Sequence, residues 1–197
     1  MEKPFVPKKY HIFLMGTSKQ KVLKVLFNYP EKEFSLTDLA KEATVSKAHL
    51  GRILENLLNE NIIQIIKLSK IWRIKANQSN PRFINAKIVY NLGLIYESGL
   101  VEFLTDHFKN PKAIILFGSF RKGDDISTSD IDIAVEGYDV KEYTILNSQD
   151  IKNLKKYESF LNKKIQIHLF NPKNADRNVF ANILNGIVLL GFLEGEA

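Results

Sequence analysis

The sequence contains no cysteine, no long hydrophobic run, no internal repeat and no low-complexity tract. Without cysteine the chain cannot form a disulfide or a thiolate metal site, which fits a reducing compartment. No stretch approaches the roughly 18 apolar residues of a membrane-spanning helix, and the apolar part of the N-terminal segment is too short and interrupted for a secretory signal. Hydrophobic residues still make up 45% of the 197 residues, enough for a packed core. We therefore expect a soluble, cytoplasmic protein of one or two domains.

Positive charge is concentrated in the N-terminal part of the chain. The net charge is +6, and the first 80 residues hold 14 Lys and Arg against 7 Asp and Glu, whereas residues 81–197 hold 14 against 15. A small basic domain indicates a polyanionic partner, although the same excess also suits a solubilising surface. The polar segment KANQSNP at 75–81 separates the two parts. We predict domains at 1–80 and 111–197, with a helical linker or packing segment at 81–110.

The first 80 residues predict three helices followed by a two-stranded hairpin. Apolar residues recur at helical spacing in 19–30, 35–43 and 46–61, and Ser35 and Ser46 are suitable N-caps. Residues 62–76, IIQIIKLSKIWRIKA, read as two strands around a turn near 68–70. The buried stripe of the third helix is expected to comprise Leu50, Ile53, Leu54, Leu57 and Leu58. Residues 81–108 read as largely helical, with a bend near Gly93 or Gly99.

The segment LTDLAKEATVSKAHLGRILENL, together with the hairpin, resembles a winged helix-turn-helix domain. The resemblance implies double-stranded DNA as a partner, with the helix after Ser46 in the major groove. Exposed hairpin cations would suit backbone phosphates. The candidate DNA-binding residues are Ser46, Lys47, His49, Arg52, Lys67, Lys70 and Arg73. The alternative is a winged helix that docks another protein and does not contact DNA.

A second motif begins where the apolar run AIILF, residues 113–117, breaks into Gly118-Ser119. The run predicts a buried strand, and glycine lets the chain turn tightly and a ligand approach closely. Ser119 supplies a hydroxyl, and the following amides can point at phosphate oxygens if SFRKG starts a helical turn. In the segment SDIDIAV, strand alternation places Asp130 and Asp132 on one face. Such a carboxylate pair is tolerated mainly when a cation lies between the two groups.

Gly118 and Ser119, followed by Asp130 and Asp132, resemble the signature of the DNA polymerase beta superfamily, and more narrowly the archaeal and bacterial minimal nucleotidyltransferases. The resemblance implies a mixed sheet with helices, and hence an α/β (α+β) protein. It also implies transfer of a nucleoside monophosphate from a nucleoside triphosphate to a hydroxyl, with two Mg²⁺ (or Mn²⁺) ions near the two aspartates. Gly118 and Ser119 would hold phosphates, assisted by Arg121 and Lys122.

The pattern departs from the superfamily at a third carboxylate, which active members carry on a neighbouring strand as general base and metal ligand. That strand should be KKIQIHLF, residues 163–170, on which Gln166 and His168 share one face. Counting from one end of the strand selects Gln166, and counting from the other end selects His168. A neutral glutamine cannot take a proton, whereas histidine can but binds Mg²⁺ poorly. Glu158, on a predicted helix, is the nearest acid and is not favoured.

Three functions therefore stay open. The first is a nucleotidyltransferase that modifies a protein, a nucleic acid or a small molecule, with activity weakened by the missing carboxylate. The second is a DNA-binding regulator whose nucleotidyltransferase-like domain senses a nucleotide or is inactive. The third is an antitoxin, because minimal nucleotidyltransferases of this kind pair with small helical toxins. A homodimer is expected on general grounds for a winged-helix regulator.

Overall fold

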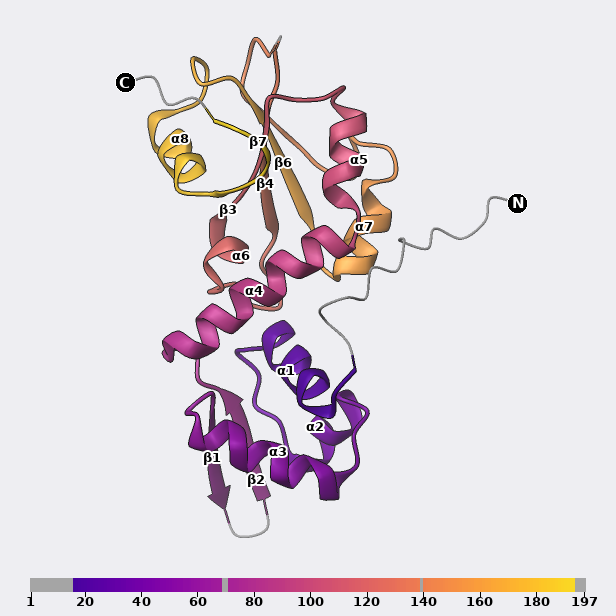
Figure 1. The fold of residues 1–197 in the computed structure, drawn as a ribbon, viewed down its shortest axis with the longest axis vertical. Coiled ribbons are helices and arrows are strands. Elements are labelled where there is room, and N and C mark those ends of the chain that lie inside the picture. Colours follow the sequence, from indigo (N-terminus) through magenta and orange to yellow (C-terminus); the bar gives the residue numbers. More distant parts are fainter. Residues whose placement is uncertain (1–15, 69–70, 139, 194–197) are drawn as a thin grey trace, which may run out of the picture. The chain divides into compact units, whose positions relative to one another are not determined.

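The computed structural model of the protein describes residues 16–68, 71–138 and 140–193 (Figure 1). These ranges contain eight helices and two β-sheets, which confirms the predicted mixed α/β (α+β) fold class. They divide into two compact units, residues 16–90 and residues 91–193. The domain limits that charge and composition suggest, at 80 and 111, remain predictions. None of the helices in these ranges has both the length and the apolar character that crossing a membrane requires.

The first unit has the predicted order of three helices and a hairpin. The elements are α1 (Ser18–Asn28), α2 (Leu36–Glu42), α3 (Lys47–Asn59), β1 (Ile63–Leu68) and β2 (Ile71–Ala76), the two strands being antiparallel. Side-chain oxygens of Thr17, Ser35 and Ser46 accept backbone N–H groups at the helix starts, so each helix begins at a hydroxyl N-cap. The expected stripe on α3 is buried except for Leu58, which is 43% exposed.

A long helix, α4 (Pro81–Glu97), follows the hairpin, and α5 (Leu100–His107) follows α4. Proline at the first helical position fits the start of α4, because its missing N–H would have no helical partner there. Gly99 takes a left-handed backbone with φ of 73° and separates the two helices. The predicted bend therefore lies at Gly99, whereas Gly93 continues the helix.

The second unit is built on a five-stranded sheet. After α5 the elements are β3 (Ala113–Phe117), α6 (Gly118–Lys122), β4 (Ile131–Glu136), β5 (Thr144–Leu146), α7 (Leu154–Leu161), β6 (Ile165–Phe170), α8 (Arg177–Leu184) and β7 (Ile187–Gly191). The strand order is β5-β6-β4-β3-β7. Strands β4 and β6 are parallel, and the other pairs are antiparallel. The predicted pairing of KKIQIHLF with SDIDIAV is therefore confirmed.

Helices cover the two faces of this sheet unequally. On one face, Ile131, Ile133 and Val135 of β4 join a large apolar cluster with residues of α5 and α7. On the other face, a smaller cluster around Phe170 and Ile183 packs under α8. Figure 1 shows α8 on one side of the sheet and α5 and α7 on the other. Phe117 and Ala134 belong to this smaller cluster. Asp132 lies on the same face of the sheet as Ala134, and its side chain is 26% exposed.

Candidate functional site

The turn after β3 brings Gly118 against the carboxylate of Asp132. Gly118 has φ of +72°, and a Cβ built on it would lie 2.1 Å from Oδ2 of Asp132. Any other residue here would be strained by its backbone and would displace the carboxylate. The helical turn α6 begins at Gly118 and includes Ser119, and no side chain caps its N-terminus. This agrees with the helical start that was predicted for the segment after Gly118.

The two aspartates share one face of the sheet, as strand alternation predicts. Asp132 lies opposite Phe117 on β3 and opposite Gln166 on β6. Asp130 is the residue directly before β4, and Ile131 between the two aspartates is buried in the opposite face. Both aspartates are partly exposed to solvent. A segment that alternates buried isoleucine with partly exposed aspartate therefore presents two carboxylates at the N-terminal end of β4.

Gln166 occupies the position beside this pair where a third carboxylate was expected. Its Cα pairs with that of Asp132 in the parallel register, and its Nε2 donates a hydrogen bond of 2.6 Å to Oδ2 of Asp130. A hydrogen bond to a charged acceptor is stronger than one between neutral groups. Gln166 therefore holds Asp130 in place as a neutral donor and adds no negative charge to the site.

His168 lies one strand repeat further along β6 and is almost fully buried. Its Nδ1 is hydrogen-bonded to the hydroxyl of Tyr143, and its Nε2 lies 3.5 Å from Oδ1 of Asp132 without another partner. A lone pair on Nε2 would face negative charge, whereas an N–H there faces a suitable acceptor. Between the two tautomers of a neutral imidazole, the geometry therefore favours the one with its proton on Nε2, in which Tyr143 donates to Nδ1. In this tautomer Nδ1 accepts a hydrogen bond from Tyr143, and the N–H at Nε2 faces the Asp132 carboxylate at 3.5 Å.

Tyr143 was not singled out from the sequence, because no motif marks it. Burial raises the pKa of the Tyr143 hydroxyl, and the negative charge of Asp132 raises it further. The hydroxyl therefore keeps its proton at neutral pH and can donate a hydrogen bond to Nδ1 of His168. The ring of Phe117 packs edge-on against the imidazole at 4.8 Å between centroids, which fixes the ring from another side.

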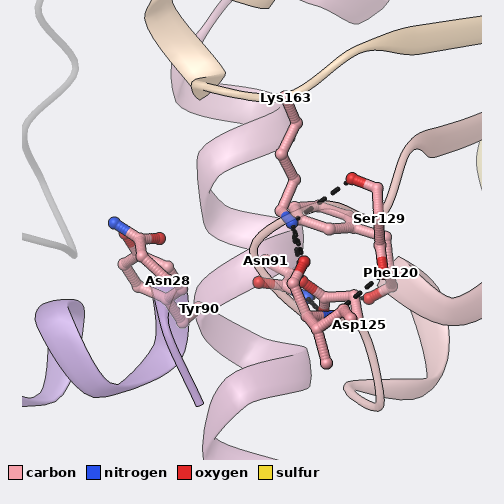
Figure 2. Close-up of polar contacts among 8 residues, drawn as sticks. Asn28, Tyr90, Asn91, Phe120, Asp125, Ser129 and Lys163 are labelled. Atoms are coloured by element: carbon pink, nitrogen blue, oxygen red, sulfur yellow. Dashed lines mark hydrogen bonds and ion pairs between the residues drawn. The ribbon is translucent and has the colours of Figure 1, made fainter. Parts of the chain in front are cut away.

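A buried polar cluster holds the loop that leads from α6 to Asp130 (Figure 2). Asn91 on α4 donates bonds of 2.8 Å to the backbone oxygen of Phe120 and to Oδ1 of Asp125. Lys163 lies 3.3 Å from Oδ2 of Asp125 and donates to the backbone oxygens of Ile126, at 2.6 Å, and of Ser129 at 3.4 Å. Asp125 is 1% exposed. A buried charge of this kind requires a partner, so the cluster fixes the approach of the chain to the aspartates.

The phosphate-contacting cations expected from the resemblance lie further along α6. Arg121 is half-buried and Lys122 is exposed, and both belong to the last turn of this short helix. The turn ends at Gly123, whose φ is 72°. The structure therefore brings Gly118, Asp130, Asp132, Gln166 and His168 together, while Arg121 and Lys122 stand at the opposite end of α6 from Gly118.

The donor set at the aspartates suits one hard cation. Among the described residues, no group of three His, Cys, Asp or Glu side chains could hold a metal ion. Mg²⁺ is commonly held by one or two carboxylates, with nucleotide phosphates and water completing the octahedron. Asp130 and Asp132 match that pattern, and the absence of a third carboxylate leaves little negative charge for a second ion.

In the first unit, several candidate DNA-binding residues are exposed on α3 and the hairpin. Lys47, His49 and Arg52 are exposed on α3, and Ser46 caps that helix by accepting the N–H of His49 at 3.3 Å. Lys67 and Arg73 have other partners in the unit, as Lys67 lies over the Trp72 ring at 4.3 Å and Arg73 is ion-paired with Glu33. Lys70 lies outside the described residues.

Residues 99–191 match the family model described as "Polymerase beta, Nucleotidyltransferase". The matched range contains the turn at Gly118, both aspartates and all of β6. The comparison confirms the nucleotidyltransferase-like character of this part of the chain. No curated protein and no solved structure matches the chain.

Proposed function

We propose that the second unit binds a nucleoside triphosphate with Mg²⁺ or Mn²⁺ and transfers its nucleoside monophosphate weakly to a hydroxyl acceptor. The observation that carries the proposal is the close packing of the Asp132 carboxylate on Gly118, beside Asp130 and at the start of α6. This arrangement supports a site in which backbone N–H groups face phosphates and two carboxylates hold the accompanying cation.

In the proposed reaction the acceptor oxygen bonds to the α-phosphorus, the bond to the β-phosphate breaks, and pyrophosphate leaves. Asp130 and Asp132 would bind the cation, which neutralises charge on the phosphate oxygens when it is present. Gly118 and Ser119 would position the triphosphate through their backbone and hydroxyl. Most of the rate enhancement would come from positioning and electrostatics, which a rigid buried framework supplies.

The step that lacks a residue is removal of the acceptor proton. Gln166 cannot accept a proton, and the favoured tautomer of His168 has its Nδ1 lone pair bonded to Tyr143 and its Nε2 protonated. General-base assistance contributes typically about 10²- to 10⁴-fold in rate. We therefore expect nucleotide binding to be retained and transfer to be slow.

The direct test is incorporation of a nucleotide labelled in its α-phosphate. The full chain is incubated with Mg²⁺ or Mn²⁺ and a cell lysate as the source of acceptors, beside Asp130→Asn and Asp132→Asn variants. Slow labelling that both variants abolish supports the proposal. Turnover at ordinary transferase rates that survives His168→Ala would show that the base comes from elsewhere. Labelling that survives both aspartate variants would remove the proposed site altogether.

A second function, DNA-binding regulation, is favoured by the exposed Lys47, His49 and Arg52 on α3. In that case the second unit would sense a nucleotide or serve as the binding partner of a toxin, and a dimer would suit paired half-sites. Against it, Ile66 and Leu68 of the hairpin are each 53% exposed, which suits docking of a protein.

Duplex binding distinguishes the two uses of the first unit. Affinity of the full chain for duplex DNA should fall steeply with salt. A Lys47→Gln/Arg52→Gln variant should lose affinity and alter the preference among sites. The matched control, Lys21→Gln/Lys24→Gln on α1, removes the same charge from another helix of the unit and should retain site preference. If the wild-type chain does not bind duplex at low salt, the docking role is correct.

A further inference from the structure

The two halves of the proposed nucleotide site lie at the two ends of one loop. The turn at Gly118, which would hold the phosphates, begins α6, and residues 123–129 connect α6 to Asp130. This loop contains no helix and no strand. Its backbone groups therefore depend on partners that reach the loop from other elements.

One ammonium group binds the part of the loop that leads into Asp130. Nζ of Lys163 donates to the backbone oxygens of Ile126, at 2.6 Å, and of Ser129 at 3.4 Å (Figure 2). It also lies 3.3 Å from Oδ2 of Asp125. These three acceptors match the three N–H donors of an ammonium group. Because Ser129 directly precedes Asp130, Lys163 fixes the backbone next to a proposed metal ligand.

One amide group connects the same cluster to α6. Nδ2 of Asn91 donates bonds of 2.8 Å to the backbone oxygen of Phe120, within α6, and to Oδ1 of Asp125. The Asp125 carboxylate thus has one oxygen toward Asn91 and the other toward Lys163. Asn91 and Asp125 are 2% and 1% exposed, and the Lys163 side chain is 7% exposed. Buried polar networks of this kind are rigid, so the cluster connects α6 to the residue before Asp130.

We propose that Asn91, Asp125 and Lys163 are positioning residues, which fix the distance between the phosphate-holding turn and the two metal-binding carboxylates. The inference rests on the proposed function. A nucleoside triphosphate with its cation engages both halves at once, so a fixed distance makes binding at the second half effectively intramolecular. Without the cluster each half can still bind its own group. The factor by which Mg²⁺ raises nucleotide affinity then falls.

A second lysine–carboxylate pair in the same unit supplies a matched control. Nζ of Lys112 lies 3.6 Å from Oε1 of Glu136, and Glu136 is 3% exposed. Glu136 is the last residue of β4, whereas Asp130 directly precedes that strand. Lys112→Met therefore removes a positive charge from beside a buried acid at the opposite end of the same strand.

The test is calorimetric titration of the full chain with a non-hydrolysable nucleoside triphosphate, with and without Mg²⁺. In Lys163→Met the factor by which Mg²⁺ raises nucleotide affinity should fall about tenfold or more, as is typical when a residue that supports metal ligands is removed. Asn91→Ala should reduce the same factor less, because it retains the bonds of Lys163 to the loop. Lys112→Met should retain the wild-type factor.

A double variant distinguishes positioning from a loss of stability. Lys163→Met leaves the buried Asp125 carboxylate without the charge of Lys163 and should be strongly destabilised in chemical denaturation. Asp125→Asn/Lys163→Met removes both charges and should regain most of that stability, since breaking a buried ion pair costs more than replacing it. The double variant still lacks the lysine bonds to Ile126 and Ser129, so its Mg²⁺ factor should stay reduced.

The outcomes separate this inference from the proposed function. A reduced Mg²⁺ factor in a stable double variant, with the wild-type factor in Lys112→Met, supports the inference. A wild-type factor in the double variant, or an equal loss in Lys112→Met, would overturn it and leave the nucleotide site standing. A wild-type chain that does not bind nucleotide would overturn the proposed function and this inference with it. If Lys163→Met does not fold, the double variant and Asn91→Ala decide the result.

Discussion

Replacing Gln166 with glutamate tests most directly how the candidate site is arranged. In Gln166→Glu the new side chain would place an oxygen where Nε2 now donates to Oδ2 of Asp130 at 2.6 Å. The variant cannot form this hydrogen bond to a charged acceptor, which costs about 1.5–3 kcal/mol. Two like charges at 4 Å also repel by about 4 kcal/mol at an effective dielectric constant of 20.

The repulsion has an upper limit, because the pair can take up a proton. Holding a carboxyl of ordinary pKa protonated at pH 7 costs about 3.7 kcal/mol, and at pH 5 about 1 kcal/mol. Both side chains are partly exposed, so solvent screening reduces these values. We expect the metal-free variant to lose about 1–3 kcal/mol of unfolding free energy at pH 7. The loss should be smaller at pH 5, because a raised native pKa destabilises the protein as pH rises.

Divalent cation should reverse the effect in the variant. With three carboxylates around the site, Mn²⁺ or Mg²⁺ should raise the stability of Gln166→Glu more than that of the wild type, and nucleotidyl transfer should increase. The measurement is chemical denaturation with and without cation, followed by the labelled-nucleotide assay. Gln149→Glu is the matched control, since Gln149 is exposed and lines the same hollow as Gln166. Equal stability and equal cation dependence in the two variants would refute the placement of Gln166 beside the metal ligands.

Two further predictions concern the close contacts of Asp132. Gly118→Ala should lower the unfolding free energy by about 1–3 kcal/mol and weaken nucleotide binding, since a left-handed backbone costs about 1–2 kcal/mol for a non-glycine residue and the new Cβ meets the carboxylate. Gly51→Ala, whose Cβ would meet open space in a helix, should be neutral or stabilising in the same denaturation experiment, and equal losses would contradict the argument. For His168, nitrogen NMR should find the Nε2-protonated tautomer wherever the imidazole is neutral, and Tyr143→Phe should produce a mixture of tautomers at a cost of about 0.5–1.5 kcal/mol. Because the Tyr143 pKa is raised, the wild-type tautomer should persist as pH rises to about 10; a proton found on Nδ1 would reverse the assignment.

The sequence was sufficient for the features that depend on local pattern. Alternation places Ile131 and Ile133 in one face and Asp132 in the other without any knowledge of neighbouring strands. Hydroxyl N-caps at Ser35 and Ser46 mark the helix starts for the same reason, since the cap bonds its own first turn. The turn at Gly118 belongs to this class as well.

Features that depend on strand register and on contacts between distant segments of the chain could not be predicted from the sequence. Counting along β6 could not decide between Gln166 and His168, because both lie on one face. The pairing with β4 favours Gln166, which is opposite Asp132, whereas His168 is opposite Ala134. Tyr143 and Lys163 reach the site from separate loops and have no local signal in the sequence. Exposure of an apolar residue at the edge of a helical stripe, as at Leu58, also depends on what packs nearby.

Calorimetric titration of the full chain with a non-hydrolysable nucleoside triphosphate and Mg²⁺ tests the central claim most directly. Wild type should bind, and Asp132→Asn should bind about 10- to 100-fold more weakly, the range by which removing a group that supports a metal site reduces affinity. Asp124→Asn removes the same charge from an exposed position in the preceding loop and should bind like wild type. The absence of nucleotide binding by the wild-type chain, or equal binding by the two variants, would contradict the claim that Gly118 and the two aspartates form a nucleotide site.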